Sequence, residues 1–226
     1  MKSKAYLAAL DIGTRSCKAV IYDPTSRQLY SASEEYGLLF PRMDYVEQDP
    51  EIWYRTAITV LRELIPRVPD ANLNIGALCI SGTNGLVMID ELGHTVSNAV
   101  MFSDRRSETQ ADELRNRYGT LLEEITGNRP MPGSFSLPII NWFREVKPEL
   151  WERVRTILVP AGYMIMRLTD KRTIDTTRAS MTLLFDPAKR RWSDVICERE
   201  SIRREILPEL FEPWEIVGRI SPEVSK

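Results

Sequence analysis

The sequence predicts an α/β domain with a mixed sheet that starts as an antiparallel β-meander and is flanked by helices. Three observations lead to this prediction. Residues 6 to 36 contain three β-rich runs separated only by turns. A stretch of apolar residues at helical spacing then follows Pro50, and a continuous apolar run occupies residues 75 to 81. Because no helix separates the first three runs, neighbouring ones should pair antiparallel.

The meander comes first along the chain. We expect strands at residues 6 to 12 and 17 to 23, with a third near Leu29 to Tyr36. The sequence Asp23-Pro24-Thr25-Ser26 supplies the turn into the third strand, because proline, aspartate and serine favour tight turns.

A helix and a buried strand should follow the meander. Asp49 is placed to cap the helix and Pro50 to occupy its first position, and Pro66 should end it. Residues 75 to 81 form a nearly unbroken apolar run, which is typical of a strand covered on both faces. That strand runs into the loop Gly82-Thr83-Asn84-Gly85, so we expect a ligand-binding edge there.

The rest of the chain is mainly helical. Residues 85 to 90 and 96 to 103 predict a hairpin, with His94, the only histidine, exposed on its turn. The whole pattern indicates a ribonuclease-H-like domain with a helical insertion at about 105 to 155. We expect helices at 107 to 118, 138 to 146, 149 to 155 and 163 to 168, and a short strand at 157 to 159.

Composition excludes several classes of protein. Thirty basic and 32 acidic side chains give a net charge of -2, so no general field attracts nucleic acid. No uninterrupted apolar run is long enough to span a membrane. Three widely separated cysteines, Cys17, Cys79 and Cys197, lack metal-ligand spacing and indicate reduced, mostly buried thiols of a cytoplasmic protein.

The first hairpin has the residues of a phosphate-binding turn. Asp11 stands where the first strand ends, and Gly13 permits a tight turn with close backbone approach. Thr14 and Ser16 offer hydroxyl donors, and Arg15 and Lys18 add positive charge. This set suits a triphosphate with Mg²⁺. An ordinary hairpin turn remains an equal alternative, since short motifs often match by chance.

Further motifs extend this pattern along the chain, and together they resemble the N-terminal domain of the FGGY carbohydrate kinases, most closely the xylulose kinase branch. These kinases belong to the superfamily of sugar kinases, actin and heat-shock ATPases. The motifs follow the order of the family across nearly all 226 residues. They are Asp11 to Thr14, Glu47 to Pro50 before Trp53, Ser81 to Gly85, Ser103 to Arg106, Thr126 to Asn128 with Pro132-Gly133, Pro160 to Tyr163, Asp175 to Ser180, and Lys189 to Asp194.

The resemblance implies transfer of the ATP γ-phosphoryl group to a hydroxyl of a sugar or polyol. By that resemblance Asp11 would hold Mg²⁺ largely through water, and Gly13 and Thr14 would approach the β- and γ-phosphates, with Arg15, Ser16 and Lys18 nearby. Gly82, Thr83, Asn84 and Asp104 would bind the sugar. For Asp104, capping of the next helix is the alternative. Arg15, Lys18, Arg105 and Arg106 are equally consistent with solvated surface charges.

Departures from the family leave the substrate open. Xylulose kinases have a longer Gly-Gln-Met-His-Gly segment where this chain has Gly82-Thr83-Asn84-Gly85, so the methionine and histidine are missing. Phe102 stands where the family usually has tryptophan. A xylulose-like ketose is the first expectation, and glycerol kinase and quorum-signal kinase activities are the alternatives.

The resemblance also implies that part of the enzyme lies outside this sequence. The general base of the family is an aspartate in a Gly-x-x-Asp segment, expected beyond Lys226, so no catalytic residue is assigned here. By the same resemblance the C-terminal nucleotide-binding domain would lie outside these residues, and we expect residues 1 to 226 to be inactive alone. Expected partners are a small sugar or polyol, the chain's own C-terminal domain and, in a homodimer, a second copy. The alternative is a stand-alone actin-like module that senses sugar without catalysis.

Overall fold

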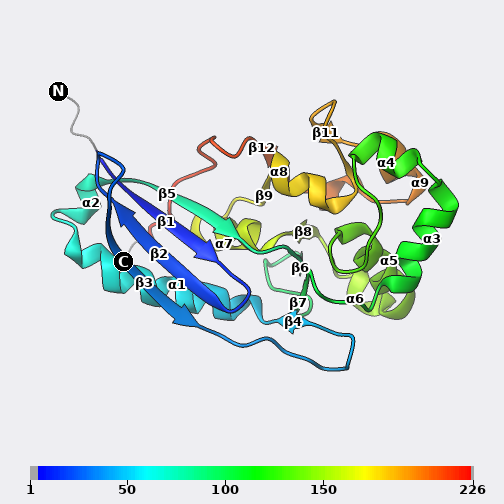
Figure 1. Ribbon diagram of the computed structural model, residues 1–226, viewed down its shortest axis with the longest axis horizontal. Coiled ribbons are helices and arrows are strands. Elements are labelled where there is room, and N and C mark those ends of the chain that lie inside the picture. Colours follow the sequence, from blue (N-terminus) through cyan, green and yellow to red (C-terminus); the bar gives the residue numbers. More distant parts are fainter. Residues whose placement is uncertain (1–4, 225–226) are drawn as a thin grey trace. The chain divides into compact units, whose positions relative to one another are not determined.

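The computed structural model describes residues 5–224, and these form two compact units (Figure 1). Unit 1 contains the described residues up to Leu38 together with Asp49–Thr83. Unit 2 contains Leu39–Gln48 and the described chain from Asn84 onward. The segment Leu39–Gln48 therefore belongs to unit 2 although unit 1 precedes and follows it in the chain.

Unit 1 is built on a four-stranded sheet in the order β3-β2-β1-β5. Its strands are β1 (Tyr6–Ile12), β2 (Ser16–Tyr22), β3 (Gln28–Glu35) and β5 (Ile75–Gly82). The first three strands form an antiparallel meander, and β5 lies parallel to β1. The predicted meander is confirmed to within one residue at each strand end, and the sheet is mixed as expected.

Helix α1 (Pro50–Leu64) covers one face of this sheet (Figure 1). The Asp49 carboxylate accepts a hydrogen bond from Glu51 N at 3.0 Å, and Pro50 occupies the first turn, as predicted. Trp53, Val60 and Leu64 are buried along one side of the helix. They pack toward the meander because their spacing places them on one stripe of an α-helix.

The structure contradicts the prediction that residues 75 to 81 form a strand covered on both faces. Strand β5 forms as expected, but among the described strands it pairs only with β1, and Ala77 and Cys79 are exposed. Leu78 and Ile80 on the other face are only half-buried. The expectation that the cysteines are mostly buried therefore holds for Cys17 and Cys197 and fails for Cys79.

Unit 2 contains a second four-stranded sheet in the order β4-β7-β6-β8. Strands β6 and β7 pair antiparallel, which confirms the predicted hairpin, and the His94 side chain on its turn is 74% exposed. A parallel pair, β9 with β12, and a short hairpin, β10 with β11, lie outside this sheet. The bounds are β4 (Glu47–Gln48), β6 (Gly85–Ile89), β7 (Ala99–Met101), β8 (Thr156–Leu158), β9 (Thr173–Asp175), β10 (Phe185–Asp186), β11 (Arg191–Trp192) and β12 (Glu209–Phe211).

Helices of unit 2 bury one apolar core that includes Leu114, Ile140, Phe143 and Phe185. Three predicted helices need correction: α5 starts two residues before Pro138, α6 ends at Trp151 instead of Arg155, and α7 starts at Pro160 instead of Tyr163. No helix in residues 5–224 is long and apolar enough to cross a membrane. The longer helices of unit 2 are α3 (Glu108–Tyr118), α4 (Leu121–Thr126), α5 (Ser136–Val146), α7 (Pro160–Thr169) and α9 (Asp194–Arg199). Its short helices are α6 (Pro148–Trp151) and α8 (Thr176–Ala179), with 3₁₀ turns at Ser180–Thr182 and Arg204–Ile206. Unit 1 adds the short helix α2 (Ala71–Asn74) and a 3₁₀ turn at Ile65–Arg67.

Candidate functional site

The turn between β1 and β2 in unit 1 is tight and closed by its own backbone. Gly13 N donates a hydrogen bond to Ser16 O at 2.9 Å. A Cβ atom at position 13 would lie 2.9 Å from the same oxygen, so only glycine fits without a shift. Asp11 is exposed at the end of β1, and the register places it opposite Lys18 of β2. The turn thus presents a carboxylate and a cation beside a narrow backbone loop.

Tyr36 stabilises this turn through hydrogen bonds of its hydroxyl group. Its hydroxyl donates to Gly13 O at 2.7 Å and lies 3.0 Å from Ser16 O, and its side chain is buried. Burial, together with the nearby Cys17 and Asp11, raises the pKa of Tyr36 well above its usual value, so the hydroxyl stays protonated as a donor. The sequence analysis did not identify Tyr36, because nothing local marks a tyrosine 23 residues after Gly13 as its partner.

The loop after β5 meets the same turn within unit 1. Strands β1 and β5 are parallel, so their carboxyl ends lie together, with Ile12 opposite Gly82. Thr83 N donates to Ile12 O at 2.7 Å, and the Thr14 and Thr83 hydroxyls lie 3.2 Å apart. The structure therefore brings together the predicted phosphate turn and the first two residues of the predicted sugar loop.

Asn84 begins a second cluster of predicted site residues, in unit 2. Its side-chain amide donates to Ser134 O at 2.7 Å, and its carbonyl accepts from Phe102 N at 3.2 Å. Gly133 has a φ of 65°, and a Cβ atom there would overlap the carbonyl oxygens of Phe102 and Asp104. Phe102 is 45% exposed. The loops that contain Asn84, Phe102 and Gly133 thus converge, with the exposed Phe102 ring and the Asn84 amide at their surface.

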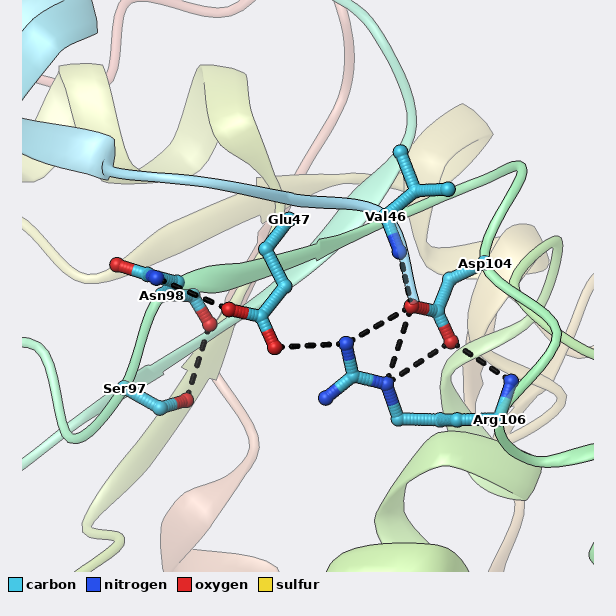
Figure 2. A network of polar contacts seen from close by, with 6 residues as sticks. All are labelled: Val46, Glu47, Ser97, Asn98, Asp104 and Arg106. Atoms are coloured by element: carbon cyan, nitrogen blue, oxygen red, sulfur yellow. Dashed lines mark hydrogen bonds and ion pairs between the residues drawn. The ribbon is translucent and has the colours of Figure 1, made fainter. Parts of the chain in front are cut away.

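Asp104 stabilises this cluster through the hydrogen bonds of its buried carboxylate. Its side chain is 0% exposed. The carboxylate accepts hydrogen bonds from Val46 N at 2.6 Å, from Arg106 N at 2.9 Å and from the Arg106 guanidinium at 2.8 to 3.0 Å (Figure 2). Asp104 does not cap the following helix, whose first-turn cap position is Ser107. The five contacts use the acceptor capacity of a carboxylate.

Arg106 is the central cation of the same network. Its side chain is 3% exposed, and besides Asp104 it binds Glu47 Oε1 at 2.7 Å, while Glu47 accepts from Asn98 (Figure 2). The guanidinium also lies 4.0 Å from the ring centre of Tyr45. Burial alone would lower the pKa of Arg106, but the hydrogen bonds and charges of Asp104 and Glu47 outweigh it and raise the pKa.

Arg105 and Arg106, for which the sequence left a ligand-binding role and a solvated surface charge equally open, therefore differ. Arg105 is 62% exposed and pairs with Glu108 at 2.7 Å, whereas Arg106 is buried and paired on several sides. The Asp-x-Arg spacing is the local signal for this pair, but the contribution of Glu47 comes from a segment 59 residues earlier.

The unit 1 cluster has donors that suit Mg²⁺ and phosphate. Mg²⁺ usually keeps several waters and binds one or two protein carboxylates plus phosphate oxygens, and Asp11 supplies one exposed carboxylate. No group of three histidine, cysteine, aspartate or glutamate side chains in residues 5–224 could form an all-protein metal site. Asp11 with the Gly13–Ser16 turn therefore fits a metal ion that arrives with a phosphate ligand.

The described fold, a mixed sheet with a tight β1–β2 turn and an adjoining polar loop, is the actin-like ATPase fold of solved sugar kinases. Comparison with known families makes this specific: residues 6–226 match the profile of the FGGY family of carbohydrate kinases, N-terminal domain, and the chain belongs to that family. The resemblance drawn from the sequence motifs is thereby confirmed.

Individual relatives agree with the family. The chain is 34% identical over 222 residues to a xylulose kinase of Lactococcus lactis, covering 98% of this chain and 44% of that protein. It is 29% identical to a glycerol kinase of Thermococcus onnurineus, covering 97% and 45%. A solved structure titled a xyloylose kinase from Brucella ovis matches with a TM-score of 0.91 at 26% identity, covering 96% and 46%. The chain thus spans about half the length of these relatives.

Proposed function

We propose that this chain is the sugar-binding half of an ATP-dependent carbohydrate kinase that phosphorylates a hydroxyl of a ketose or polyol, with a xylulose-like ketose as the first candidate. The observation that carries the proposal is the closed Gly13–Ser16 turn beside the exposed Asp11 carboxylate, next to the hydroxyls of Thr14 and Thr83. Membership of the FGGY family supports the reaction class, and the xylulose kinase relatives support the substrate class.

In this proposal the bound Mg²⁺–ATP supplies the phosphoryl group and neutralises part of its charge. Asp11 holds the metal, largely through water, and the backbone of Gly13 and Thr14 approaches the phosphates. Arg15, Ser16 and Lys18 complete the phosphate-binding set, with exposed charges at positions 15 and 18 that favour the approach of an anion. Tyr36 holds the turn in a fixed shape, so little reorganisation is needed when phosphate binds.

Gly82, Thr83, Asn84 and Asp104 form the proposed sugar-binding set. The Asn84 amide group donates to Ser134 O, which leaves its side-chain oxygen as an acceptor for a sugar hydroxyl. Asp104 contributes by position, because its buried carboxylate fixes the backbone that leads to the exposed Phe102 ring. The helical insertion at about 105 to 155 is proposed to support this side of the site.

The remaining machinery lies outside the described residues. We propose that the general base is an aspartate beyond Lys226, in the C-terminal domain or in the segment that leads to it. Lys226 itself lies outside the described residues. That domain would supply the adenosine site and close over the substrate to exclude water. We place the complete enzyme in the cytoplasm, where ATP is available and the three free cysteines stay reduced.

Glycerol kinase activity is the second candidate, because a glycerol kinase is among the relatives and the Thr83-Asn84 loop lacks the family's methionine and histidine. The altered loop also suits a kinase that acts on a quorum signal. A module that senses sugar without catalysis is the candidate from outside the enzymes. One experiment separates all of these from the first proposal.

The test is phosphoryl transfer by the parent chain, extended beyond Lys226, against ketoses, pentitols, glycerol and a quorum-signal polyol with ATP and Mg²⁺. We expect turnover of one substrate, and an Asp11→Asn variant should lose about 100-fold or more in kcat/KM because the metal loses its charged ligand. Glu34→Gln, an exposed acid on β3, is the matched control and should keep full activity. Binding of a sugar without turnover by the folded wild type would favour the sensing module. Full activity of Asp11→Asn would refute the assigned role of Asp11.

A further inference from the structure

The Thr83 side chain contacts the Gly13–Ser16 turn. Its hydroxyl oxygen lies 3.2 Å from that of Thr14, although the two residues are 69 positions apart in the chain, and both residues are half-buried. Thr83 belongs to the loop that departs from the longer segment of xylulose kinases. Its role in this chain therefore follows from its own contacts.

The backbone holds the Thr83 hydroxyl beside the turn. Thr83 N donates a hydrogen bond to Ile12 O at 2.7 Å, and the parallel register places Gly82 opposite Ile12. Threonine is branched at Cβ, which restricts rotation of its side chain. The pairing of β1 with β5 thus positions this hydroxyl before any ligand binds, so little conformational freedom is lost on binding.

The supply of protons gives the contact between the two hydroxyls a direction. A threonine hydroxyl has one proton to donate and two lone pairs that accept. Phosphate oxygens of ATP accept hydrogen bonds, so a Thr14 hydroxyl that binds phosphate uses its proton there. The proton between the two side chains then belongs to Thr83, which donates to Thr14. Two hydrogen bonds in such a chain strengthen each other.

We propose that Thr83 is a positioning residue for phosphoryl transfer, which donates to the Thr14 hydroxyl and so directs the Thr14 proton to a β- or γ-phosphate oxygen of ATP. The inference rests on the proposed kinase function, in which Thr14 approaches the phosphates, and adds a residue that acts through Thr14. Toward a sugar, the Thr83 hydroxyl keeps its lone pairs and can only accept, which fixes its direction within the proposed sugar-binding set.

Removing the hydroxyl while keeping the shape of the side chain tests the proposal. In the parent chain extended beyond Lys226, Thr83→Val should raise the Kd for Mg²⁺–ATP by about 3–10-fold, measured by titration calorimetry. Thr83→Ser keeps the donor and should stay within about twofold of the unchanged chain. Thr59→Val is the matched control, because the exposed Thr59 hydroxyl on α1 donates to Arg55 O, and it should leave this Kd unchanged.

A double variant shows whether Thr83 acts through Thr14. Thr14→Val alone should raise the Kd for Mg²⁺–ATP by about tenfold or more, because it removes a hydrogen bond to a charged group. Adding Thr83→Val to Thr14→Val should then weaken binding by less than about twofold further, since no hydroxyl remains to be positioned. Equal weakening by Thr83→Val in both backgrounds would indicate a merely structural role and would overturn the proposal.

Two other results would also overturn it. One is an unchanged Kd for Mg²⁺–ATP in folded Thr83→Val, with folding checked by circular dichroism. The other is a rise in the KM for the sugar alone, which would make Thr83 a sugar ligand only. Thr83→Ala takes the place of Thr83→Val in every comparison if the valine variant does not fold.

The binding measurement separates this inference from the proposed function. An active parent kinase whose ATP affinity does not depend on Thr83 refutes the inference alone. Binding of ATP that Thr83→Val weakens, without turnover of any sugar or polyol, refutes the proposed function alone. A folded parent chain that does not bind Mg²⁺–ATP refutes both.

Discussion

Removing the Arg106 side chain by Arg106→Ala should be among the most damaging single changes to the stability of unit 2. The substitution deletes the guanidinium contacts to Asp104 and Glu47, which lie at 2.7 to 3.0 Å. The Asp104 carboxylate, 0% exposed, then keeps only the backbone amides of Val46 and residue 106 as donors. A buried charge is left without its counter-charge.

Breaking a buried ion pair from one side costs roughly 3–5 kcal/mol, because the remaining charge stays desolvated. For a domain of this size that corresponds to a fall in Tm of roughly 6–20 °C. Thermal unfolding of the 226-residue chain, followed by circular dichroism, measures it. Arg105→Ala, at the exposed neighbouring position, is the matched control and should leave the Tm unchanged.

A double variant separates the lost pair from lost packing. Asp104→Asn added to Arg106→Ala removes the uncompensated charge, so part of the lost stability should return. If Arg106→Ala lowers the free energy of unfolding by less than about 1 kcal/mol, the network is worth no more than a surface ion pair and the reasoning fails.

Three further changes probe the backbone and the β1–β2 turn. Gly133→Ala should destabilise unit 2 by roughly 1–3 kcal/mol, since φ is 65° and the new Cβ meets backbone oxygens; an unchanged urea midpoint would contradict this. Tyr36→Phe should cost roughly 1–2 kcal/mol through lost hydrogen bonding and raise the KM for ATP in the extended chain, and a shift in stability with no shift in KM would limit Tyr36 to a structural role. Burial, then Asp11 and Glu34, raise the pKa of Cys17 from 9.0 to about 12. The folded state holds the Cys17 proton more tightly than the unfolded state does, so the free energy of unfolding should fall as the pH rises from 9.0 to about 12. Over this pH range the urea midpoint should fall less steeply for Cys17→Ala than for the unchanged chain.

The parts of the fold that the sequence predicted are those fixed by nearby residues. The β1–β2 turn follows from Gly13 and its polar neighbours, and the start of α1 follows from Asp49 and Pro50. Those signals act within a few residues, so a sequence pattern can show them. The part of the candidate site at the β1–β2 turn could be proposed from the sequence for the same reason.

The features that were missed depend on distant partners. The apolar run of β5 predicted a strand but could not show what covers it, and in residues 5–224 only β1 pairs with it. Arg106 resembled its neighbour Arg105 in the sequence, and only the fold brings Glu47 to it, from 59 residues earlier in the chain. Tyr36 likewise meets Gly13 only once three strands have paired.

The path of residues 39 to 48 has a consequence for synthesis on the ribosome. This segment lies between β3 and α1 in the chain, yet Val46 binds Asp104, which is made 58 residues later. At about 5–20 residues per second the segment waits roughly 3–12 s for its partner. During that time α1 can pack against the nascent meander, while residues 39 to 48 still lack their later partner. A ribosome-bound intermediate with a folded first unit and a protease-sensitive loop at 39 to 48 is therefore expected, and it would be the point at which chaperones meet this chain.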